Sequence, residues 1–415
     1  MSAVTKDTGI IELNGHTSFV LGSDVYKWSD SFVFVVDAYV STSATHSVSY
    51  NFAGMGWNIG LLHFSGSSAA VVTDSSVGTE DAGNNVWINH IDLYGTGPNS
   101  VTLNHAEAGT IDGGASSDTV RIGTWTEFIN LGRGNDTFTL TGEGEAETVD
   151  MGRGNDVVNI GAGWVFSVDM GRGNDTVTIG TGSFDAIDLG RDSDTIKFSA
   201  STTGIGLIDG GEKVSDVSEV PGARDFDTLD FSAFSKALTV DFAANSATAS
   251  GVDFQIVSFE SVIGGAKGDN LSGAGDADTL DGRGGNDALN GRGGNDILVG
   301  GIGADKLTGG AGADTFLYKA LAESSVTSFD TIVDFSEAQH DKINLSTIDA
   351  STKVSGNNAF VFIGNSAFTG TADQLRYVTS SSGTDVFADI NGDKVADLKI
   401  HLSTAVTLHA ADFAL

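Results

Sequence analysis

The sequence predicts an all-β protein built around a parallel β-roll, or β-solenoid, with an N-terminal β domain before it and a C-terminal β cap after it. Six consecutive nonapeptides between residues 264 and 316 keep one phase without interruption. A looser repeat of 18 to 21 residues precedes them over residues 91–210. Residues 1–90 alternate apolar and polar side chains in short runs, which is typical of β-strands.

The nonapeptides place an aspartate at the same point of every repeat. Glycine opens each unit and leucine or phenylalanine fills its eighth position, as in Gly291-Arg-Gly-Gly-Asn-Asp-Ile-Leu-Val299. A nine-residue period puts successive units on alternate sides of a flattened coil, so one full coil takes two units and buries one apolar side chain per half-turn. The sixth position is occupied by Asp269, Asp278, Asp287, Asp296, Asp305 and Asp314.

The looser repeat keeps the aspartate on one side only. Its coils begin at Ile91, Ile111, Ile129, Val149, Val168, Ile187 and Ile208. Four coils retain a Gly-x-x-x-Asp turn, which supplies Asp136, Asp156, Asp175 and Asp194. The opposite half-coils lack this aspartate, and the first coil has Asn99 in its place, which is typical of a capping coil. A metal bound in this region would therefore line one edge.

These nonapeptides resemble those of the repeats-in-toxin family of secreted proteins, whose glycine- and aspartate-rich repeats form a parallel β-roll that binds calcium. The resemblance implies that each Ca²⁺ lies between two turns on one edge, held by sixth-position aspartates and backbone carbonyls. It pairs Asp269 with Asp287, Asp278 with Asp296, Asp287 with Asp305, and Asp296 with Asp314. Lys267 and Asp276 replace the usual glycine at position four, so we expect weaker binding in the first two turns. The alternative is a metal-free solenoid with Asn-Asp turns.

The sequence after Phe316 resembles the C-terminal domain that follows the β-roll in serralysin-type proteases. The resemblance rests on Ser328-Phe-Asp-Thr-Ile-Val-Asp-Phe335 and Asp341-Lys-Ile-Asn-Leu-Ser-Thr-Ile-Asp349. Within this region Asp389, Asn391, Asp393 and Asp397 occupy loop positions 1, 3, 5 and 9, which predicts a weak or incomplete calcium site. A plain Asn-Gly hairpin turn is the alternative. The segment Asp412-Phe-Ala-Leu415 resembles the acidic-then-hydrophobic terminus that type I secretion machinery recognises in this family.

The repeats and resemblances divide the chain into five expected parts. Residues 1–90 form an N-terminal β domain of unknown type, and residues 91–210 form a degenerate β-solenoid. Residues 211–263 contain an excursion loop and a return strand, and residues 264–317 form the calcium β-roll. Residues 318–415 form the C-terminal capping and secretion domain.

The composition restricts the partners and the compartment. A formal net charge of -34 argues against nucleic acid and anionic membranes as partners, and no stretch approaches the length of a membrane span. The absence of cysteine fits a chain that folds outside the cell without disulfides. Because this negative charge opposes compaction, we expect calcium to act as a folding switch. The N-terminus lacks a signal-peptide pattern, so we expect type I export of an unfolded chain.

The sequence lacks the motifs of the related secreted enzymes. None of its eight histidines belongs to a His-Glu-x-x-His helix, and no Gly-x-Ser-x-Gly elbow occurs. We therefore assign no catalytic residue. The five tryptophans, Trp28, Trp57, Trp87, Trp125 and Trp164, are expected in the core rather than on a carbohydrate platform.

Two further columns of charged residues accompany the looser repeat. The residues that follow its opening aliphatic positions are Asp92, Asp112, Asn130, Asp150, Asp169, Asp188 and Asp209. Arg133, Arg153, Arg172 and Arg191 follow three positions later in four coils. Our hypothesis is that these arginines neutralise the acidic column and brace the turns. The rival is a catalytic acid pair of a sugar-acting β-helix.

The sequence favours a secreted, calcium-binding structural protein of the cell surface or extracellular matrix, of the surface-layer, biofilm or adhesin type. Its expected partners are calcium, further copies of itself or a cell-surface glycan, and the type I secretion machinery. One alternative is a carbohydrate-active enzyme such as a lyase or epimerase. Another is a secreted signalling or pore-forming effector.

Overall fold

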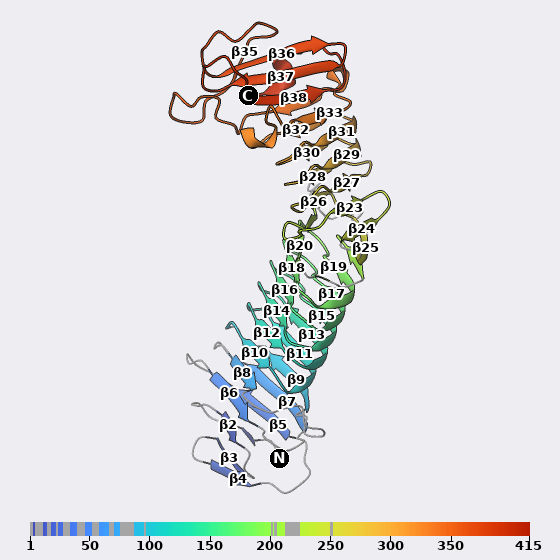
Figure 1. Cartoon of the computed structure of the whole chain (residues 1–415). Coiled ribbons are helices and arrows are strands. Elements are labelled where there is room, and N and C mark those ends of the chain that lie inside the picture. The colour runs from blue at the N-terminus through green and yellow to red at the C-terminus, as the bar shows by residue number, and fades with distance from the viewer. Residues whose placement is uncertain are drawn as a thin grey trace. The chain divides into compact units, whose positions relative to one another are not determined.

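The computed structural model is all-β, with a parallel β-solenoid (Figure 1). It describes residues 87–94, 97–200, 202, 206–211, 225–249 and 252–415, and of the first 86 residues only the strands. These residues include no α-helix, and none forms a helix long and apolar enough to cross a membrane. Three short 3-10 helices are η1 (Leu321–Glu323), η2 (Glu337–Gln339) and η3 (Ala410–Asp412). The predicted fold class is confirmed.

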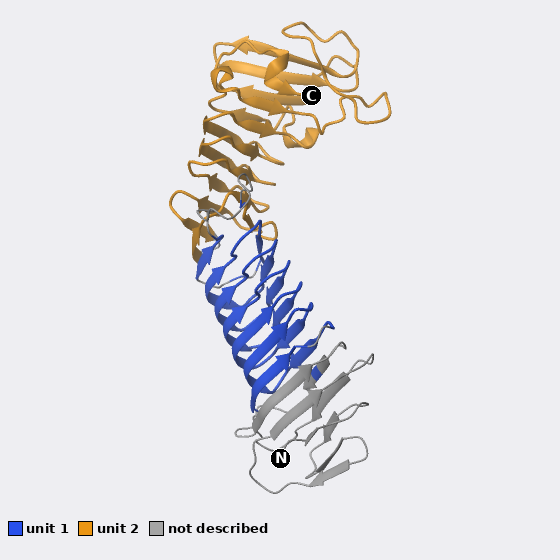
Figure 2. Ribbon diagram, turned by 180° about the vertical axis from the view of Figure 1, so that it is seen from behind, with its two compact units in different colours: residues 1–225 blue, residues 226–415 orange. Residues whose placement is uncertain are grey.

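The chain divides into two compact units, Met1–Asp225 and Phe226–Leu415 (Figure 2). In unit 1 each coil contributes one strand to each of two parallel sheets. The first sheet contains β1 (Ala3–Val4), β5 (Phe34–Tyr39), β7 (Asn58–Ser65), β9 (Trp87–Leu93), β11 (Glu107–Gly114), β13 (Trp125–Gly132), β15 (Glu145–Asp150), β17 (Trp164–Asp169), β19 (Ser183–Asp188) and β21 (Leu207–Asp209). The second contains β2 (Ile11–Asn14), β6 (His46–Asn51), β8 (Ala70–Asp74), β10 (Ser100–Leu103), β12 (Thr119–Ile122), β14 (Thr137–Leu140), β16 (Val157–Ile160), β18 (Thr176–Ile179) and β20 (Thr195–Phe198). A separate hairpin joins β3 (Ser18–Leu21) and β4 (Asp24–Lys27).

The coils of unit 1 stack in register, so equivalent residues form straight columns. Asn130 pairs with Asp150, Asp150 with Asp169, and Asp169 with Asp188. Strands β5 and β7 pair in parallel with the same sheet as β9, and β6 and β8 with the same sheet as β10. The parallel ladder therefore continues on the N-terminal side of residue 91.

The core of unit 1 is a set of apolar columns between the two sheets. Ile111, Ile129, Val149 and Val168 stack along the first sheet and are at most 1 % exposed. Facing columns of the second sheet are buried in the same way. Each coil thus removes its aliphatic side chains from water, and each coil covers the apolar edge of its neighbour.

Unit 2 begins with a solenoid of shorter strands. Its first sheet contains β23 (Leu238–Asp241), β24 (Ser246–Ala249), β25 (Val252–Val257), β27 (Asn270–Ser272), β29 (Ala288–Gly293), β31 (Lys306–Ala311), β33 (Asp330–Ile332), β35 (Val361–Phe362), β36 (Gln374–Ser380), β37 (Gly383–Asp389) and β38 (Leu398–Leu402). The second sheet contains β22 (Thr228–Asp230), β26 (Ser261–Ile263), β28 (Thr279–Asp281), β30 (Ile297–Val299), β32 (Thr315–Leu317), β34 (Lys342–Asn344) and β39 (Phe413–Ala414).

The nonapeptide units form the regular part of unit 2. Their eighth-position side chains are all buried at 0 to 1 % exposure, from Leu271 to Phe316. Before them, β23, β24 and β25 form an antiparallel meander, while β22 pairs in parallel with β26 and β23 with β27. After them, β38 continues the sheet beside β33, and β36, β37 and β38 pair antiparallel.

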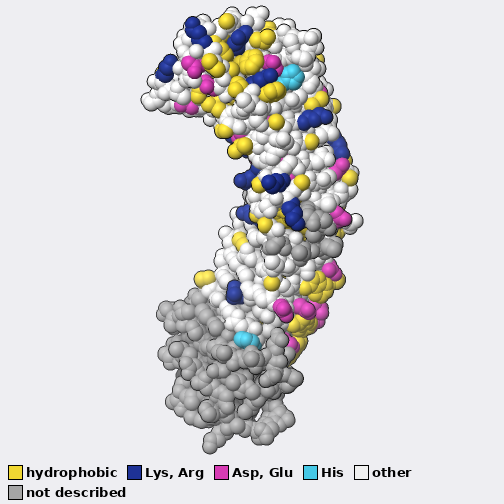
Figure 3. All heavy atoms as spheres, viewed as in Figure 1, with side chains coloured by type: hydrophobic (Ala, Val, Ile, Leu, Met, Phe, Trp, Pro, Cys, Tyr) yellow, Lys and Arg dark blue, Asp and Glu magenta, His cyan; other side chains and the backbone are white. Residues whose placement is uncertain are grey.

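The tryptophans in the described region lie outside the core. Trp87, Trp125 and Trp164 are half-buried at the starts of β9, β13 and β17, so the expectation of core positions is wrong for them. The rings of Trp87 and Trp125 stack with centroids 5.4 Å apart, and Trp164 meets Phe166 edge to face. Figure 3 shows hydrophobic and acidic side chains gathered together on this side of unit 1. Trp28 and Trp57 lie outside the described residues.

Candidate metal sites in the turns

The predicted aspartates of unit 1 form one buried column. Asp136, Asp156, Asp175 and Asp194 each end a turn directly before a strand of the second sheet, and all are at most 2 % exposed. The backbone N–H groups of Asp136, Asp156 and Asp175 each donate a hydrogen bond to Oδ1 of the aspartate in the next coil, over 2.6 to 2.7 Å. The parallel register thus brings these four carboxylates, which lie 19 or 20 residues apart, into one line.

Asp118 extends this column by one coil, although the sequence analysis missed it. Its N–H donates to Oδ1 of Asp136 at 2.6 Å, and its own Oδ1 accepts from the backbone N–H and side-chain amide of Asn99. Asn99 therefore occupies the column position that the sequence assigned to it. The signal for Asp118 was present in the sequence, because Gly114-Ala-Ser-Ser-Asp118 has the same Gly-x-x-x-Asp spacing and lies 18 residues before Asp136.

The nonapeptide aspartates of unit 2 form two columns, one before each sheet. Asp269, Asp287 and Asp305 precede β27, β29 and β31, while Asp278, Asp296 and Asp314 precede β28, β30 and β32. Within each column the N–H of one aspartate donates to Oδ1 of the aspartate 18 residues later. These are the aspartate pairs that the family resemblance implies.

Two aspartates beyond the nonapeptides continue these columns. The N–H of Asp305 donates to Oδ1 of Asp330 at 2.9 Å, and that of Asp314 donates to Oδ1 of Asp341 at 3.1 Å. The separations of 25 and 27 residues hide these positions from a search with a fixed period. The remaining signal is local, because Asp330-Thr-Ile332 and Asp341-Lys-Ile343 repeat the Asp-x-Leu pattern of the nonapeptides.

The second oxygen of most column aspartates has no hydrogen-bond partner. These Oδ2 atoms are buried, and they belong to Asp118, Asp136, Asp156, Asp175, Asp287, Asp296, Asp305 and Asp314. A buried polar atom left without a partner costs about 1–3 kcal/mol, and more when the group is charged. The same feature recurs in successive coils, so each coil holds a buried carboxylate oxygen that is available to a ligand.

Burial favours the neutral form of these carboxylates and so raises their pKa. Removal from water raises the pKa of Asp136 to about 7 and that of Asp175 to about 8, and neighbouring aspartates add to both shifts. In unit 2 burial likewise raises the pKa of Asp287 and Asp296 to about 7. A bound cation would remove both the desolvation cost and the repulsion between carboxylates.

Glycine leaves a space beside each of these oxygens in the last four nonapeptides. A Cβ added to Gly291 would lie 2.1 Å from Oδ2 of Asp296, and one added to Gly309 would lie 2.2 Å from Oδ2 of Asp314. At Gly282 and Gly300 the corresponding distance is 2.5 Å. An orphaned carboxylate oxygen beside a space that any side chain would fill fits a small cation with oxygen ligands.

The first two nonapeptide turns, in which Lys267 and Asp276 replace a glycine, satisfy their own carboxylates. Oδ2 of Asp269 accepts the N–H of Gly265 at 2.8 Å, and Oδ2 of Asp278 accepts the N–H of Ala274 at 2.7 Å. The later turns instead have a positive φ at their second residue, as at Arg283 with 64°. Weaker metal binding in the first two turns stays a prediction.

The loop from Asp389 to Asp397 also satisfies its own carboxylates. Asp389 accepts hydrogen bonds from the backbone N–H groups of Asn391, Gly392 and Lys394. Both oxygens of Asp397 accept from the side-chain amide of Asn391, and Oδ1 of Asp393 accepts from the N–H of Val395. This pattern, between antiparallel strands β37 and β38, favours the hairpin-turn alternative.

The arginine column makes no ion pair with the acidic column at three of its four positions. The side chains of Arg133, Arg153 and Arg172 have no hydrogen bond or ion pair with any described residue, so the neutralisation hypothesis is wrong for them. At the start of the column a histidine is the partner instead, since His90 Nε2 contacts Asp92 and lies 2.9 Å from Asp112 Oδ2.

A comparison with known families supports the assignment of the C-terminal part. Residues 217–415 match the family described as Peptidase M10 serralysin C terminal. This part of the chain is similar to a serralysin-type C-terminal domain. The serralysin-type domain contains both aspartate columns of unit 2, including Asp330 and Asp341. The resemblance to repeats-in-toxin proteins with this domain is thereby confirmed.

Several solved structures are similar to parts of the chain. The AlgE6R3 subunit of the mannuronan C5-epimerase from Azotobacter vinelandii is 28 % identical, with a TM-score of 0.27, over 37 % of this chain and 80 % of that chain. The AlgE6R2 subunit of the same enzyme is 29 % identical, with a TM-score of 0.28, over 36 % of this chain and 90 % of that chain. The extracellular lipase LipA from Serratia marcescens is 17 % identical, with a TM-score of 0.25, over 68 % of this chain and 45 % of that chain. No curated protein matches the chain.

Proposed function

We propose that this chain is a secreted calcium-binding structural protein of the cell surface or extracellular matrix, and that its solenoid folds as calcium enters the turn columns. The observation that supports this most strongly is the repeated orphaned carboxylate oxygen. Oδ2 of Asp296 and Oδ2 of Asp314 are buried without a partner, each beside a glycine whose missing side chain leaves space for an ion.

Calcium fits these turns better than the other common metals. The turns offer carboxylate oxygens and backbone carbonyls, and the aspartate columns contain no histidine. Hard oxygen ligands in an irregular cage are typical of calcium, whereas zinc favours nitrogen and sulfur and magnesium retains several waters. In unit 2 the ligands would come from Asp287, Asp296, Asp305, Asp314, Asp330 and Asp341. In unit 1 they would come from Asp118, Asp136, Asp156, Asp175 and Asp194.

Calcium binding would couple directly to folding. The columns exist only when successive coils are stacked, so an unfolded chain has no preformed site. A ligand that binds only the folded state stabilises it in proportion to the logarithm of its concentration. The formal charge of -34 strengthens this dependence, because the apo chain repels itself. A chain exported unfolded from a low-calcium cytosol would fold after release.

The proposal of a structural role rests on the repeats and on the outer surface of unit 1. Phe128 and Phe166 are 45 % and 51 % exposed on the first sheet, beside the half-buried tryptophans. Exposed aromatic side chains in one area are typical of contact surfaces. A carbohydrate-active enzyme is supported less well. The groove on this unit is lined by a single carboxylate, Asp150, whereas glycoside hydrolysis uses a pair.

The proposal is tested by negative-stain electron microscopy and light scattering of the full chain, with and without millimolar calcium. We expect a folded protein in calcium that forms sheets, filaments or higher oligomers. A Phe128→Ser, Phe166→Ser variant should still fold in calcium but should assemble less. A monodisperse monomer at every calcium concentration would contradict the structural role. A circular dichroism spectrum that is the same in chelator as in calcium would contradict the calcium switch.

A further inference from the structure

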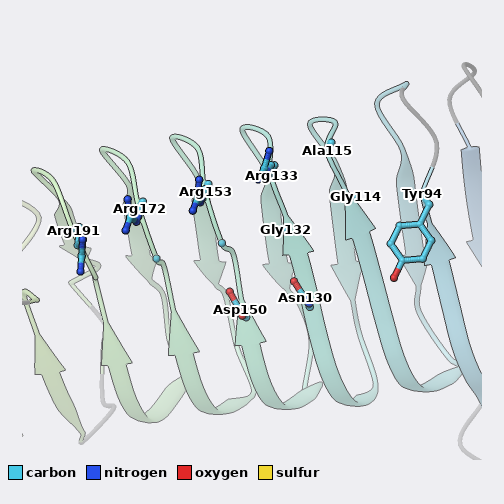
Figure 4. Close-up of a pocket in the computed structure, with 12 residues that line it drawn as sticks. Tyr94, Gly114, Ala115, Asn130, Gly132, Arg133, Asp150, Arg153, Arg172 and Arg191 are labelled. Carbon is cyan, nitrogen blue, oxygen red and sulfur yellow. The ribbon is translucent and has the colours of Figure 1, made fainter. Parts of the chain in front are cut away.

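An open groove runs along successive coils of unit 1 from Tyr94 to Arg191, beside the turns that follow the first sheet. Its volume is about 830 Å³. Figure 4 shows Arg133, Arg153, Arg172 and Arg191 one behind another on successive turns, with Asn130 and Asp150 on the strands below them. Tyr94 lies at the N-terminal end of this row, and glycines such as Gly132 and Gly152 line the wall between.

The arginines form a regular ladder. Arg133, Arg153, Arg172 and Arg191 are joined in sequence by parallel backbone bridges, so their Cα atoms repeat at the strand spacing of about 4.8 Å. Like charges at this spacing repel one another unless a counter-charge intervenes. The ladder therefore has an electrostatic cost that the fold must offset.

The first three arginines make no ion pair with any described residue. Arg133, Arg153 and Arg172 are exposed and form no ion pair. Arg292 occupies the same position in a Gly-Arg-Gly turn of unit 2, where its guanidinium makes two hydrogen bonds of 2.7 Å to Asp241. That pair holds the pKa of Asp241 below its ordinary value. An arginine in this turn can thus hold a carboxylate, and the unit 1 ladder presents three that hold none.

The rest of the groove adds groups that suit sugar rings. Asn130 and Asp150 offer oxygen acceptors for hydroxyl groups, and the side chain of Asn130 also offers a donor. Tyr94 is 55 % exposed and presents an aromatic face at the end of the groove. The turn glycines leave the backbone open to close approach.

We infer that this groove binds an acidic oligosaccharide along the solenoid axis, with its carboxylates on the arginine ladder and its hydroxyls on Asn130 and Asp150. Planar guanidinium groups bind carboxylates through paired hydrogen bonds. A saccharide is favoured over a nucleic acid because Asn130 and Asp150 can accept hydrogen bonds from the hydroxyl groups of sugar rings, of which a nucleic acid backbone has few. The inference adds a ligand to the proposed function. It rests on the proposed function only in that the solenoid must be folded, which we expect in calcium.

The test is isothermal titration calorimetry of the full chain with short galacturonate oligomers, at one calcium concentration in cell and syringe. Folding is first verified by circular dichroism. We expect binding that weakens as salt increases, and no binding of the matching neutral galactose oligomers. The Arg153→Gln, Arg172→Gln variant should lose affinity by at least about tenfold, since two charged hydrogen-bonding groups are removed.

Arg283→Gln is the matched control, because Arg283 is an exposed arginine of the same Gly-Arg-Gly sequence in unit 2. It should bind as the unaltered chain does. If the double variant does not fold, Tyr94→Ala at the exposed end of the groove should weaken binding several-fold.

Folded protein that does not bind galacturonate, or a double variant that binds it equally well, would overturn the inference. Equal affinity for polyphosphate or single-stranded DNA would overturn the choice of a saccharide. A chain that is equally folded in chelator would count against the proposed calcium switch and leave the binding result independent.

Discussion

The backbone N–H of Asp296 donates a hydrogen bond of 3.0 Å to Oδ1 of Asp314, while Oδ2 of Asp314 is buried without a partner beside Gly309. One oxygen thus joins adjacent coils and the other faces a space. The unpartnered second oxygen recurs along three columns, and the space beside glycine recurs along the two columns of unit 2. This arrangement separates the structural task of the aspartate from the metal-binding task that we propose. The predictions below test that separation.

The first prediction is that replacing a column aspartate by asparagine has opposite effects on stability in chelator and in calcium. Asp296→Asn keeps an oxygen for the N–H of Asp278 but removes the buried charge. In chelator the variant should be more stable than the unaltered chain, because a repelling, desolvated carboxylate is lost. In calcium it should be less stable by about 1–3 kcal/mol, because a charged ligand is lost. The residual β-signal in circular dichroism measures the effect in chelator, and denaturant unfolding measures it in calcium.

Asp276→Asn is the control for that experiment, because it removes the same charge from an exposed residue of a neighbouring turn. It should change the calcium dependence little. Equal effects of Asp276→Asn and Asp296→Asn would indicate that general charge, and not a site, determines the calcium response.

The second prediction concerns the missing side chain of glycine. Gly291→Ala would place a Cβ 2.1 Å from Oδ2 of Asp296 and 2.6 Å from the carbonyl oxygen of Gly309. It should raise the calcium concentration required for folding. Gly275→Ala should not, since a Cβ there meets no atom within 4 Å. Calcium titrations monitored by circular dichroism compare the two variants, and identical midpoints would refute the assigned space.

The third prediction grades the turns against one another. Oδ2 of Asp278 is satisfied by the N–H of Ala274, whereas Oδ2 of Asp296 has no partner. Asp278→Asn should therefore shift the calcium midpoint less than Asp296→Asn does. Calcium stoichiometry by calorimetry should fall for the Asp296 variant. A larger loss for the Asp278 variant would show that the first turns are the stronger sites.

The fourth prediction concerns pH. Burial raises the pKa of Asp287 and Asp296 to about 7, above the ordinary value of 3.8, so the folded apo chain binds protons more tightly than the unfolded chain. The stability from these groups is present below pH 4 and is lost as the pH rises through 7. In chelator the chain should thus be more stable at pH 5 than at pH 8. In calcium the dependence should reverse, because protons compete with the metal.

The β-signal in circular dichroism at several pH values measures the trend in chelator, and thermal unfolding at the same pH values measures the trend in calcium. The decisive outcome is whether the stability of the chain in chelator increases or decreases between pH 5 and pH 8. Stability that increases with pH in the absence of calcium would contradict the buried, uncompensated state of the columns.

The sequence predicted the columns wherever an unbroken period ties turn to strand. Asp269 to Asp314 keep one spacing, so the parallel register follows from counting. Asp330 and Asp341 were missed because η1, η2 and their loops lengthen the connection without changing the stacking. A column is thus defined in space by hydrogen bonds between coils, and its period is visible only when the intervening loops are equal in length.

The side-chain environments of unit 1 were less predictable. Composition suggested that Arg153 neutralises the acidic column, but the two columns lie three residues apart on a flat ladder and form no ion pair at this position. The tryptophans were expected inside, yet stacked coils leave room in the core for aliphatic columns, and Trp125 lies on the outer face. The strand register, which follows from the repeat, predicts which residues align between coils. Side-chain packing determines which of the aligned residues contact one another.

The central claim is tested most directly by far-UV circular dichroism of the full chain at pH 8 during a calcium titration from excess chelator. The account predicts a largely unfolded spectrum in chelator and a cooperative gain of β-structure as calcium is added. Magnesium at the same concentration should not produce this gain. A β-rich spectrum that is the same in chelator and in calcium would contradict the account.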